Sequence, residues 1–208
     1  MEKIIYGHEN IKRAIEVYAV AKTIHNFPMY VVGRNGFGVS AIKEFYMRMP
    51  NIDQYDYDDL KFVELSETDT KEEAIETAAY IRSSKGACVQ AAQYPLYANI
   101  SKCRFLGKEC ESRKQVRDRV NKAIALLKEN QAITVKSNAV SALFENAFNR
   151  LHLSYDDADT CLALALAIKA LDEAEHIEPQ HIAEAINYCC KNTSIEEIIL
   201  FHNEEKSF

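Results

Sequence analysis

The residues whose spacing most clearly fits a chemical role lie between Met29 and Ser40, in the stretch MYVVGRNGFGVS. A short apolar run breaks there into a loop with three glycines, and a segment of helical character follows. This order and spacing are those of the phosphate-binding loop G-x-x-x-x-G-K-S/T, in which backbone N–H groups and a lysine hold phosphate. Position 39, where the motif has its lysine, is valine in this chain. The loop supplies eight candidate nucleotide-binding residues: Gly33, Arg34, Asn35, Gly36, Phe37, Gly38, Val39 and Ser40.

Two interpretations of this glycine loop follow from its residues. In the first, backbone N–H groups and the N-terminus of the next helix still form an anion cradle, with Arg34 as a substitute cation. In the second, the glycines form only a turn between strand and helix, with Phe37 and Val39 packed where phosphate would lie. We favour the second interpretation, because valine places an apolar side chain where the motif needs a positive charge.

Composition bounds the classes of protein that remain. With 208 residues, 48% of them apolar, the chain is long enough to bury a core and to form one domain or two small ones. The formal charge of −6 and the lack of a Lys/Arg run disfavour direct nucleic-acid contact. From the sequence we expect no leader peptide, and no apolar run approaches the roughly 20 residues needed to span a membrane. The six cysteines lack CxxC spacing, so we expect reduced thiols in a cytoplasmic protein.

The first half of the chain alternates strands with helices. This alternation predicts a parallel, three-layer α/β sheet. Thr68 or Asp69 is the expected N-cap of the helix that begins near residue 70. The acidic loop 51–59 is expected to be solvated, because it lacks the glycine and the terminal glutamate of a calcium loop. We predict helices at 9–24, 41–49 and 70–83, and strands at 29–32, 60–65, 87–92 and 103–106.

The second half of the chain reads as entirely helical. Apolar residues recur there at the spacing of amphipathic helices, and Pro179 suits the first turn of one of them. We therefore divide the chain into an α/β domain at 1–108 and an all-helical lid domain at 109–208. The predicted helices span 112–128, 138–151, 155–174, 179–191 and 194–202.

Several motifs resemble magnesium-chelatase-type AAA+ ATPases, in particular the ComM/YifB branch. The stretch from Tyr6 to Glu16 resembles the entry helix of that family, and His25-Asn26 resembles the pair that precedes its first strand. Leu151-His-Leu-Ser and His181-Ile-Ala-Glu-Ala-Ile-Asn-Tyr are similar to its C-terminal lid. The resemblance covers most of the chain, thins between about 50 and 105, and includes no Lon-protease-like N-terminal domain.

The resemblance implies a fold with a P-loop core and a lid, and it names the groups that ATP hydrolysis would need. The family's lysine is Val39 here, and the strand that ends in Asp-Glu matches Phe62-Val63-Glu64, which keeps Glu64 and lacks the aspartate. Losing an arginine finger alone costs on the order of 10³-fold in rate. The other positions that differ are Tyr94 at the sensor asparagine, Asn99 at the arginine finger, and Asp156, Asp157, Asp159 and Thr160 where the lid has its sensor arginines.

These losses predict a pseudo-ATPase without catalytic residues. Our leading hypothesis is a non-hydrolysing AAA+-like scaffold or regulatory module that binds a protein partner or itself. The alternatives are an ATP-binding sensor or weak ATPase, and an accessory to a DNA-processing motor. We expect no bound cofactor, with ATP and Mg²⁺ the two that the degenerate motif leaves open. We also expect no metal site, since His8, His25 and His181 lie on entry segments or helix surfaces without metal-ligand spacing. The predicted turn at Tyr94–Tyr97 is either a contact surface or an ordinary loop.

Overall fold

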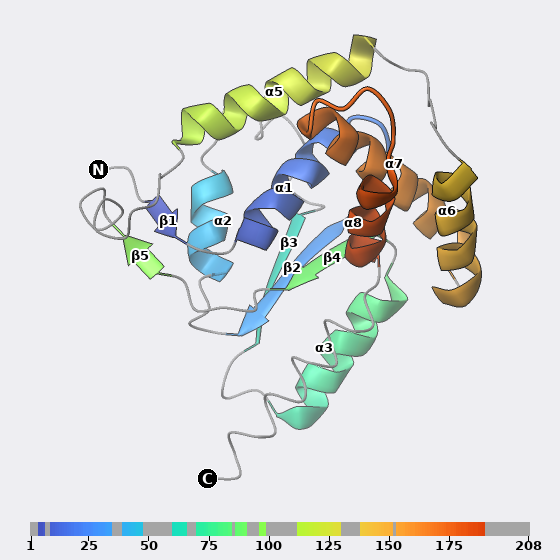
Figure 1. Cartoon of the computed structure of the whole chain (residues 1–208). Coiled ribbons are helices and arrows are strands. Elements are labelled where there is room, and N and C mark those ends of the chain that lie inside the picture. Colours follow the sequence, from blue (N-terminus) through green and yellow to red (C-terminus); the bar gives the residue numbers. More distant parts are fainter. Residues whose placement is uncertain are drawn as a thin grey trace.

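The structure is a computed structural model, and it describes residues 4–6, 9–34, 39–47, 60–65, 70–84, 86–90, 96–98, 112–129, 138–151 and 153–189. Short strands and longer helices alternate in the first half, and helices alone follow in the second (Figure 1). The strands are β1 (Ile4–Tyr6), β2 (Met29–Arg34), β3 (Leu60–Leu65), β4 (Ala87–Gln90) and β5 (Leu96–Ala98). The helices are α1 (Glu9–Ala21), α2 (Val39–Met47), α3 (Lys71–Ser83), α5 (Arg113–Glu129), α6 (Asn138–Leu151), α7 (Tyr155–Leu171) and α8 (Pro179–Cys189).

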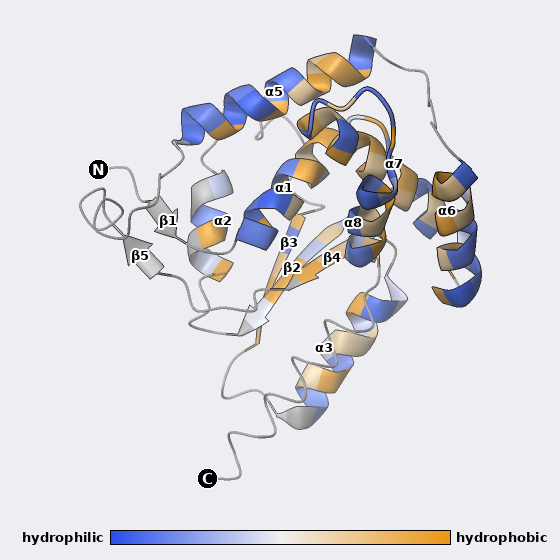
Figure 2. Cartoon of the chain, in the orientation of Figure 1, coloured by the Kyte–Doolittle hydropathy of each residue, from blue (hydrophilic) through white to orange (hydrophobic). Residues whose placement is uncertain are grey.

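A three-stranded parallel sheet lies at the centre of the first half, in the order β3-β2-β4. Met29 of β2 lies opposite Leu60 of β3 on one side and Ala87 of β4 on the other. The strands read as nearly continuous apolar runs, which is expected when both faces of a parallel sheet are covered (Figure 2). The predicted parallel sheet is confirmed among the described residues.

Helices cover both faces of this sheet. Tyr30 and Val32 of β2 pack with Ile81 of α3 in a small core on one face. Met29 and Val31 point to the other face and join the main core. Since β2 is followed by a strand on one side and then by a strand on the other, right-handed crossovers place α2 and α3 on opposite faces. The carboxyl ends of β2 and β3, where the glycine loop begins, therefore lie beside α2.

The main core runs without interruption from the first half of the chain into the second. Ile11 and Ile15 of α1 are fully buried, as are Leu164 and Ile168 of α7, and all four belong to one hydrophobic cluster. Helices α5 and α8 also contribute to this cluster, so α7 lies in the middle of the helical half (Figure 1). The division of the chain at 108 and 109 stays a prediction, and this core crosses it.

A second, small sheet was not predicted. Strands β1 and β5 pair antiparallel, with Ile5 opposite Tyr97. The predicted turn at Tyr94–Tyr97 is therefore wrong for Leu96 and Tyr97, which lie in β5. Each strand has only three residues, which is too short for a pattern of alternation to be visible in the sequence.

Most predicted elements exist, and the differences lie at their ends. Helix α1 ends at Ala21 instead of residue 24, and α7 ends at Leu171 instead of 174. Thr70 is the N-cap of α3, where it forms a capping box with Glu73, so the predicted caps at Thr68 and Asp69 are wrong. The expected loop at 51–59, strand at 103–106 and helix at 194–202 lie outside the described residues.

Candidate functional site

The candidate nucleotide site lies at the carboxyl ends of β2 and β3. Gly33 is opposite Glu64 in the parallel register, so both predicted site residues lie at the same edge of the sheet. Gly33 and Arg34 belong to strand β2, which corrects their placement in the loop. Asn35, Gly36, Phe37 and Gly38 lie outside the described residues, and their predicted cradle stays a prediction.

Val39 is the first residue of α2 and its side chain lies in the main core. It is 1% exposed, and it continues the buried stripe that Ile42 and Tyr46 form at helical spacing along the inner face of α2. An apolar residue at this position therefore extends the packing of α2 against the rest of the protein. The packed position that we favoured for Val39 agrees with this burial, and the side chain brings no charge to the site.

Ser40 and Glu64 meet at the N-terminus of α2. The Ser40 hydroxyl donates to Glu64 Oε2 at 2.6 Å, and the Ser40 backbone N–H donates to Glu64 Oε1 at 3.4 Å. The first N–H groups of a helix have no partner within the helix, and they carry partial positive charge. The carboxylate of Glu64 is thus the anion at this helix N-terminus, held from the neighbouring strand.

This arrangement is compatible with two chemical roles. A serine hydroxyl and a carboxylate side by side are the protein groups that hold Mg²⁺ in P-loop enzymes. The same carboxylate, bonded to a helix N-terminus, also fills the position that an anion would take. Both side chains are exposed, and the described part of the chain contains no cluster of three or more His, Cys, Asp or Glu residues that could hold a metal ion.

The residues at the start of α7, where the resemblance predicts sensor arginines, include two with structural roles. Ser154 is the N-cap of α7, and its capping box uses Asp157. Thr160 is buried on the same helix. Asp157 therefore helps to begin helix α7, Thr160 packs in its interior face, and neither side chain carries a positive charge.

A group of charges that joins α1 to the helical half was not found from the sequence. The Arg13 guanidinium contacts Asp172 Oδ1 at 2.7 Å and Glu184 Oε1 at 3.1 Å. Tyr188 donates its hydroxyl proton to the same Glu184 oxygen at 2.9 Å. Burial acts to lower the pKa of Arg13, but the two carboxylates outweigh burial and raise it. Burial, together with the charge of Glu184, raises the pKa of Tyr188.

A second charge pair of opposite polarity lies on the next turn of α1. Glu16 accepts two hydrogen bonds from the Arg119 guanidinium of α5, at 2.8 and 2.9 Å. The Glu16 side chain is only 4% exposed, so this pair lies at the edge of the core. Helix α1 therefore contacts α5 through the carboxylate of Glu16. It contacts the end of α7 and helix α8 through the guanidinium of Arg13.

His181 was expected on a helix surface, and this expectation is wrong. Its side chain is 1% exposed because α8 packs against α7 along this face. The ring Nδ1 accepts a hydrogen bond from the backbone N–H of Glu178 at 3.0 Å, and Nε2 lies 3.6 Å from Asp172 Oδ2. The His181 ring therefore caps a backbone N–H at the start of helix α8, and it lies close to the ion pair of Arg13 with Asp172.

One comparison with known protein families matches the helical half. Residues 109–189 match the family model described as magnesium chelatase, subunit ChlI C-terminal. The match supports a magnesium-chelatase-like, AAA+-related origin for this half, and α5 to α8 make up the matched segment. Neither the search of curated proteins nor the search of solved structures found a match. No helix among the described residues is long and apolar enough to cross a membrane.

Proposed function

We propose that this protein is a non-hydrolysing AAA+-like module of the magnesium-chelatase type, which acts in the cytoplasm by binding a protein partner or by self-association. The observation that carries the proposal is the burial of Val39 in the main core. Phosphoryl transfer on a P-loop depends on the lysine charge at this position. A side chain that contributes to the core at this point serves folding, and it offers nothing to a nucleotide.

The charge pairs on α1 support the same proposal. In a working motor, a lid must change its position during the nucleotide cycle. Here Arg13 and Glu16 tie α1 to three helices of the matched segment. These ties, together with a core shared by α1 and α7, favour a helical half that keeps one position.

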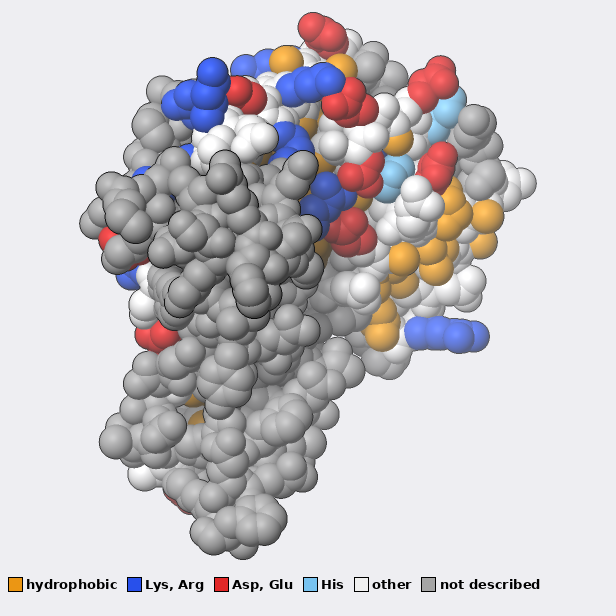
Figure 3. Space-filling view, turned by 60° about the vertical axis from the view of Figure 1, so that its left-hand side comes forward, with side chains coloured by type: hydrophobic (Ala, Val, Ile, Leu, Met, Phe, Trp, Pro, Cys, Tyr) orange, Lys and Arg blue, Asp and Glu red, His pale blue; other side chains and the backbone are white. Residues whose placement is uncertain are grey.

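The corner between α6 and α7 is the surface that we assign to partner binding. Leu151 is 44% exposed and Tyr155 is 85% exposed, and the Tyr155 ring lies 5.9 Å from that of Phe148. Exposed apolar side chains that lie together often mark interaction surfaces. Direct nucleic-acid contact is not part of the proposal, because the chain carries a net charge of −6. In the view of Figure 3, acidic and basic side chains are mixed along the top, where α5 lies in Figure 1.

Sedimentation of the native chain and of two variants tests this surface. We expect self-association or partner capture to fall when Leu151 and Tyr155 are both replaced by serine. Ile75→Ser is the matched control, because Ile75 lies on α3 and is also 44% exposed. A native chain that sediments only as a monomer and recovers no partner from a native lysate would count against the proposal.

A nucleotide-binding sensor is the second candidate, and one observation favours it. Ser40 and Glu64 are in hydrogen-bond contact and exposed, as the two protein ligands of a Mg²⁺–nucleotide complex would be. In this candidate ATP and Mg²⁺ are the ligands. The hydrogen bond between Ser40 and Glu64 breaks, and both side chains then bind the metal.

Calorimetric titration of ATP, with and without Mg²⁺, separates the two candidates. The module predicts no saturable binding, since Glu64 fills the anion position, and Glu64→Gln should at most introduce weak binding that does not depend on Mg²⁺. The sensor predicts binding tighter than about 0.1 mM, roughly −5.5 kcal/mol, that Mg²⁺ strengthens and Glu64→Gln weakens. Ser112→Ala is a control, because Ser112 caps α5 far along the chain from this site.

A further inference from the structure

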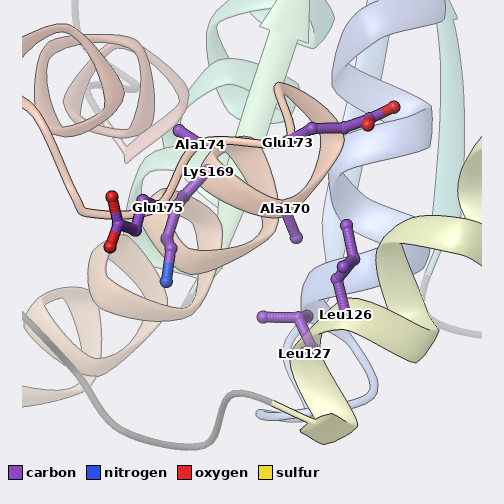
Figure 4. Close-up of a pocket in the computed structure, with 7 residues that line it drawn as sticks. All are labelled: Leu126, Leu127, Lys169, Ala170, Glu173, Ala174 and Glu175. Atoms are coloured by element: carbon purple, nitrogen blue, oxygen red, sulfur yellow. The ribbon is translucent and has the colours of Figure 1, made fainter.

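A pocket lies between the second half of α5 and the last turn of α7 (Figure 4). Its volume is about 210 Å³, which suits a ligand of few heavy atoms. Leu126 and Leu127 of α5 form one wall, and Ala170 and Ala174 lie across from them. The described residues of the candidate nucleotide site, Ser40 and Glu64 among them, do not line this pocket.

Lys169 of α7 forms a further wall of this pocket, and its side chain runs down one side in Figure 4. The residue is only 6% exposed. Within the described part of the chain, its ammonium group makes no hydrogen bond and no ion pair. A lysine can pack its stem along an apolar wall and keep its charged end accessible, so the ammonium group of Lys169 can pair with a carboxylate that enters the pocket.

The rim of the pocket limits the charge of a ligand. Glu175 extends at one side of the pocket, and its side chain is 86% exposed. Glu173 is at the other side, where it pairs with Lys122 at 2.6 Å. Two carboxylates at the rim repel a polyanion such as a nucleotide, whereas a single negative charge can be neutralised by Lys169.

The backbone at Glu173 is also unusual. Its φ of 54° lies in the left-handed region, which favours glycine. A glutamate at this position costs free energy relative to glycine, and strained residues of this kind cluster at binding sites. The conformation turns the chain at the end of α7, so that Ala174 and Glu175 follow directly along the edge of the pocket.

We propose that this pocket binds a monocarboxylate with a short apolar body. The carboxylate pairs with Lys169 Nζ, and the apolar body lies between the two leucines of α5 and the two alanines that follow Lys169. Two sources share this chemistry, a free aliphatic acid and the C-terminal carboxylate of a peptide that ends in an apolar residue. The inference is independent of the function proposed above, since it uses a different part of the fold.

Binding of hexanoate, hexanol and hexylamine to the whole chain, followed by NMR, tests the charge preference. We expect saturable shifts with hexanoate, and at least about tenfold weaker binding of the alcohol and the amine, because a charge-assisted hydrogen bond is lost. A peptide ending in leucine with a free carboxylate, compared with its C-terminal amide, tests the second source in the same way. If neither hexanoate nor the free-carboxylate peptide binds, or if hexanol binds as tightly as hexanoate, the proposal is wrong.

Two variants localise the binding. Lys169→Met keeps the length and packing of the side chain and should weaken hexanoate or peptide binding by about tenfold or more. Lys114→Met is the matched control, because Lys114 is an exposed lysine of α5 away from the pocket. Ala174→Leu fills the pocket while it keeps Lys169, and it should abolish binding in a chain that is still folded. Unchanged binding in Lys169→Met or in Ala174→Leu would overturn the assignment of this site.

Discussion

At the carboxyl ends of β2 and β3, one carboxylate meets one helix N-terminus, and both Ser40 and Glu64 are exposed. Between α1 and the helical half, two arginines meet three carboxylates, and one of these, Glu16, is almost fully buried. The first region is the candidate nucleotide site. The second joins α1 to the helical half, which the proposed function treats as a lid that keeps one position. Among the side chains that the structure describes, one carboxylate contacts the start of α2, whereas two arginines and three carboxylates join α1 to the helical half.

The same contrast holds for the apolar residues. Val39 occupies the position of the motif's lysine, and it packs in the main core with the residues of α1 and α7. One hydrophobic core therefore includes both Val39 and residues of the helical half. The described structure gives this position a role in packing, and the following predictions test this comparison in order of decreasing effect.

The largest effect is expected for Val39→Lys. This change restores the motif lysine and places an ammonium at a position where the native side chain is only 1% exposed. We expect a loss of roughly 3 kcal/mol or more in the free energy of unfolding, measured by urea denaturation. Val39→Ala, which shortens the side chain without adding a charge, should cost less. A lysine that is tolerated without loss would show that the position opens onto the loop, and the two regions would then differ less than we infer.

Local sequence patterns predicted the elements around this site and missed the contacts between distant ones. Strand β3 and helix α6 have the predicted bounds, because apolar spacing within a short segment determines them. The pairing of β1 with β5, and the contact of Arg13 with Glu184, join residues that lie far apart in the chain. Exposed-looking polar residues such as His181 become buried only through packing of one helix on another, which no local pattern contains.

The candidate nucleotide site was predicted only in part, again because contacts between distant residues leave no local pattern in the sequence. The motif singled out Ser40 and Glu64 separately, and their hydrogen bond follows from the parallel register of β2 and β3. Lys169 had no motif around it, and its burial depends on how α5 crosses α7. Sequence reasoning therefore found the part of the molecule that resembles a known motif, and it could not find a site made by two helices.

The second prediction concerns the ion pair between Glu16 of α1 and Arg119 of α5. Arg119→Met removes both bonds to Glu16 and leaves that carboxylate at the edge of the core. We expect a loss of about 2–3 kcal/mol, since removing one partner of a buried ion pair is strongly destabilising. The control is Lys12→Met, which breaks the pair with the exposed Glu9 and should cost under about 0.5 kcal/mol. Equal losses in the two variants would mean that burial of Glu16 adds nothing, and the proposed fixing of the helical half would lose its basis.

Tyr188→Phe should have an effect that depends on pH. Near neutral pH it removes the hydrogen bond to Glu184 and should cost about 1 kcal/mol. Burial raises the pKa of Tyr188 above its ordinary value of 10, so the folded state holds this proton more tightly than the unfolded state. The stability that the phenol contributes is present below pH 10 and is lost as pH rises above it. Urea denaturation between about pH 8 and 11 should therefore show a shallower decline in the variant than in the native chain.

When the native chain is compared with Tyr188→Phe, the contributions of the other tyrosines to the pH dependence of stability cancel. The pKa of Tyr80 is lowered by its hydrogen bonds with Tyr30 and Lys61, so Tyr80 acts in the opposite direction, and it does so in both proteins. Tyr155→Phe, at a side chain that is 85% exposed, should leave both the stability and its pH dependence unchanged. An identical alkaline decline in native and Tyr188→Phe protein would remove Tyr188 from the network that joins α1 to α8.

The smallest effect, and a gain, is expected for Glu173→Gly. Glycine relieves the left-handed strain at φ 54°, which is of the order of 1 kcal/mol, but it gives up the exposed pair with Lys122 and adds entropy to the unfolded chain. We expect a net stabilisation of about 0.5 kcal/mol by thermal unfolding. Lys122→Met, which removes the ion pair and keeps the backbone, should be neutral or slightly destabilising. A chain selected only for stability would have glycine at position 173. A clear loss of stability in Glu173→Gly would therefore show that the glutamate stabilises the end of α7. Backbone strain would then no longer distinguish the pocket from the rest of the helical half.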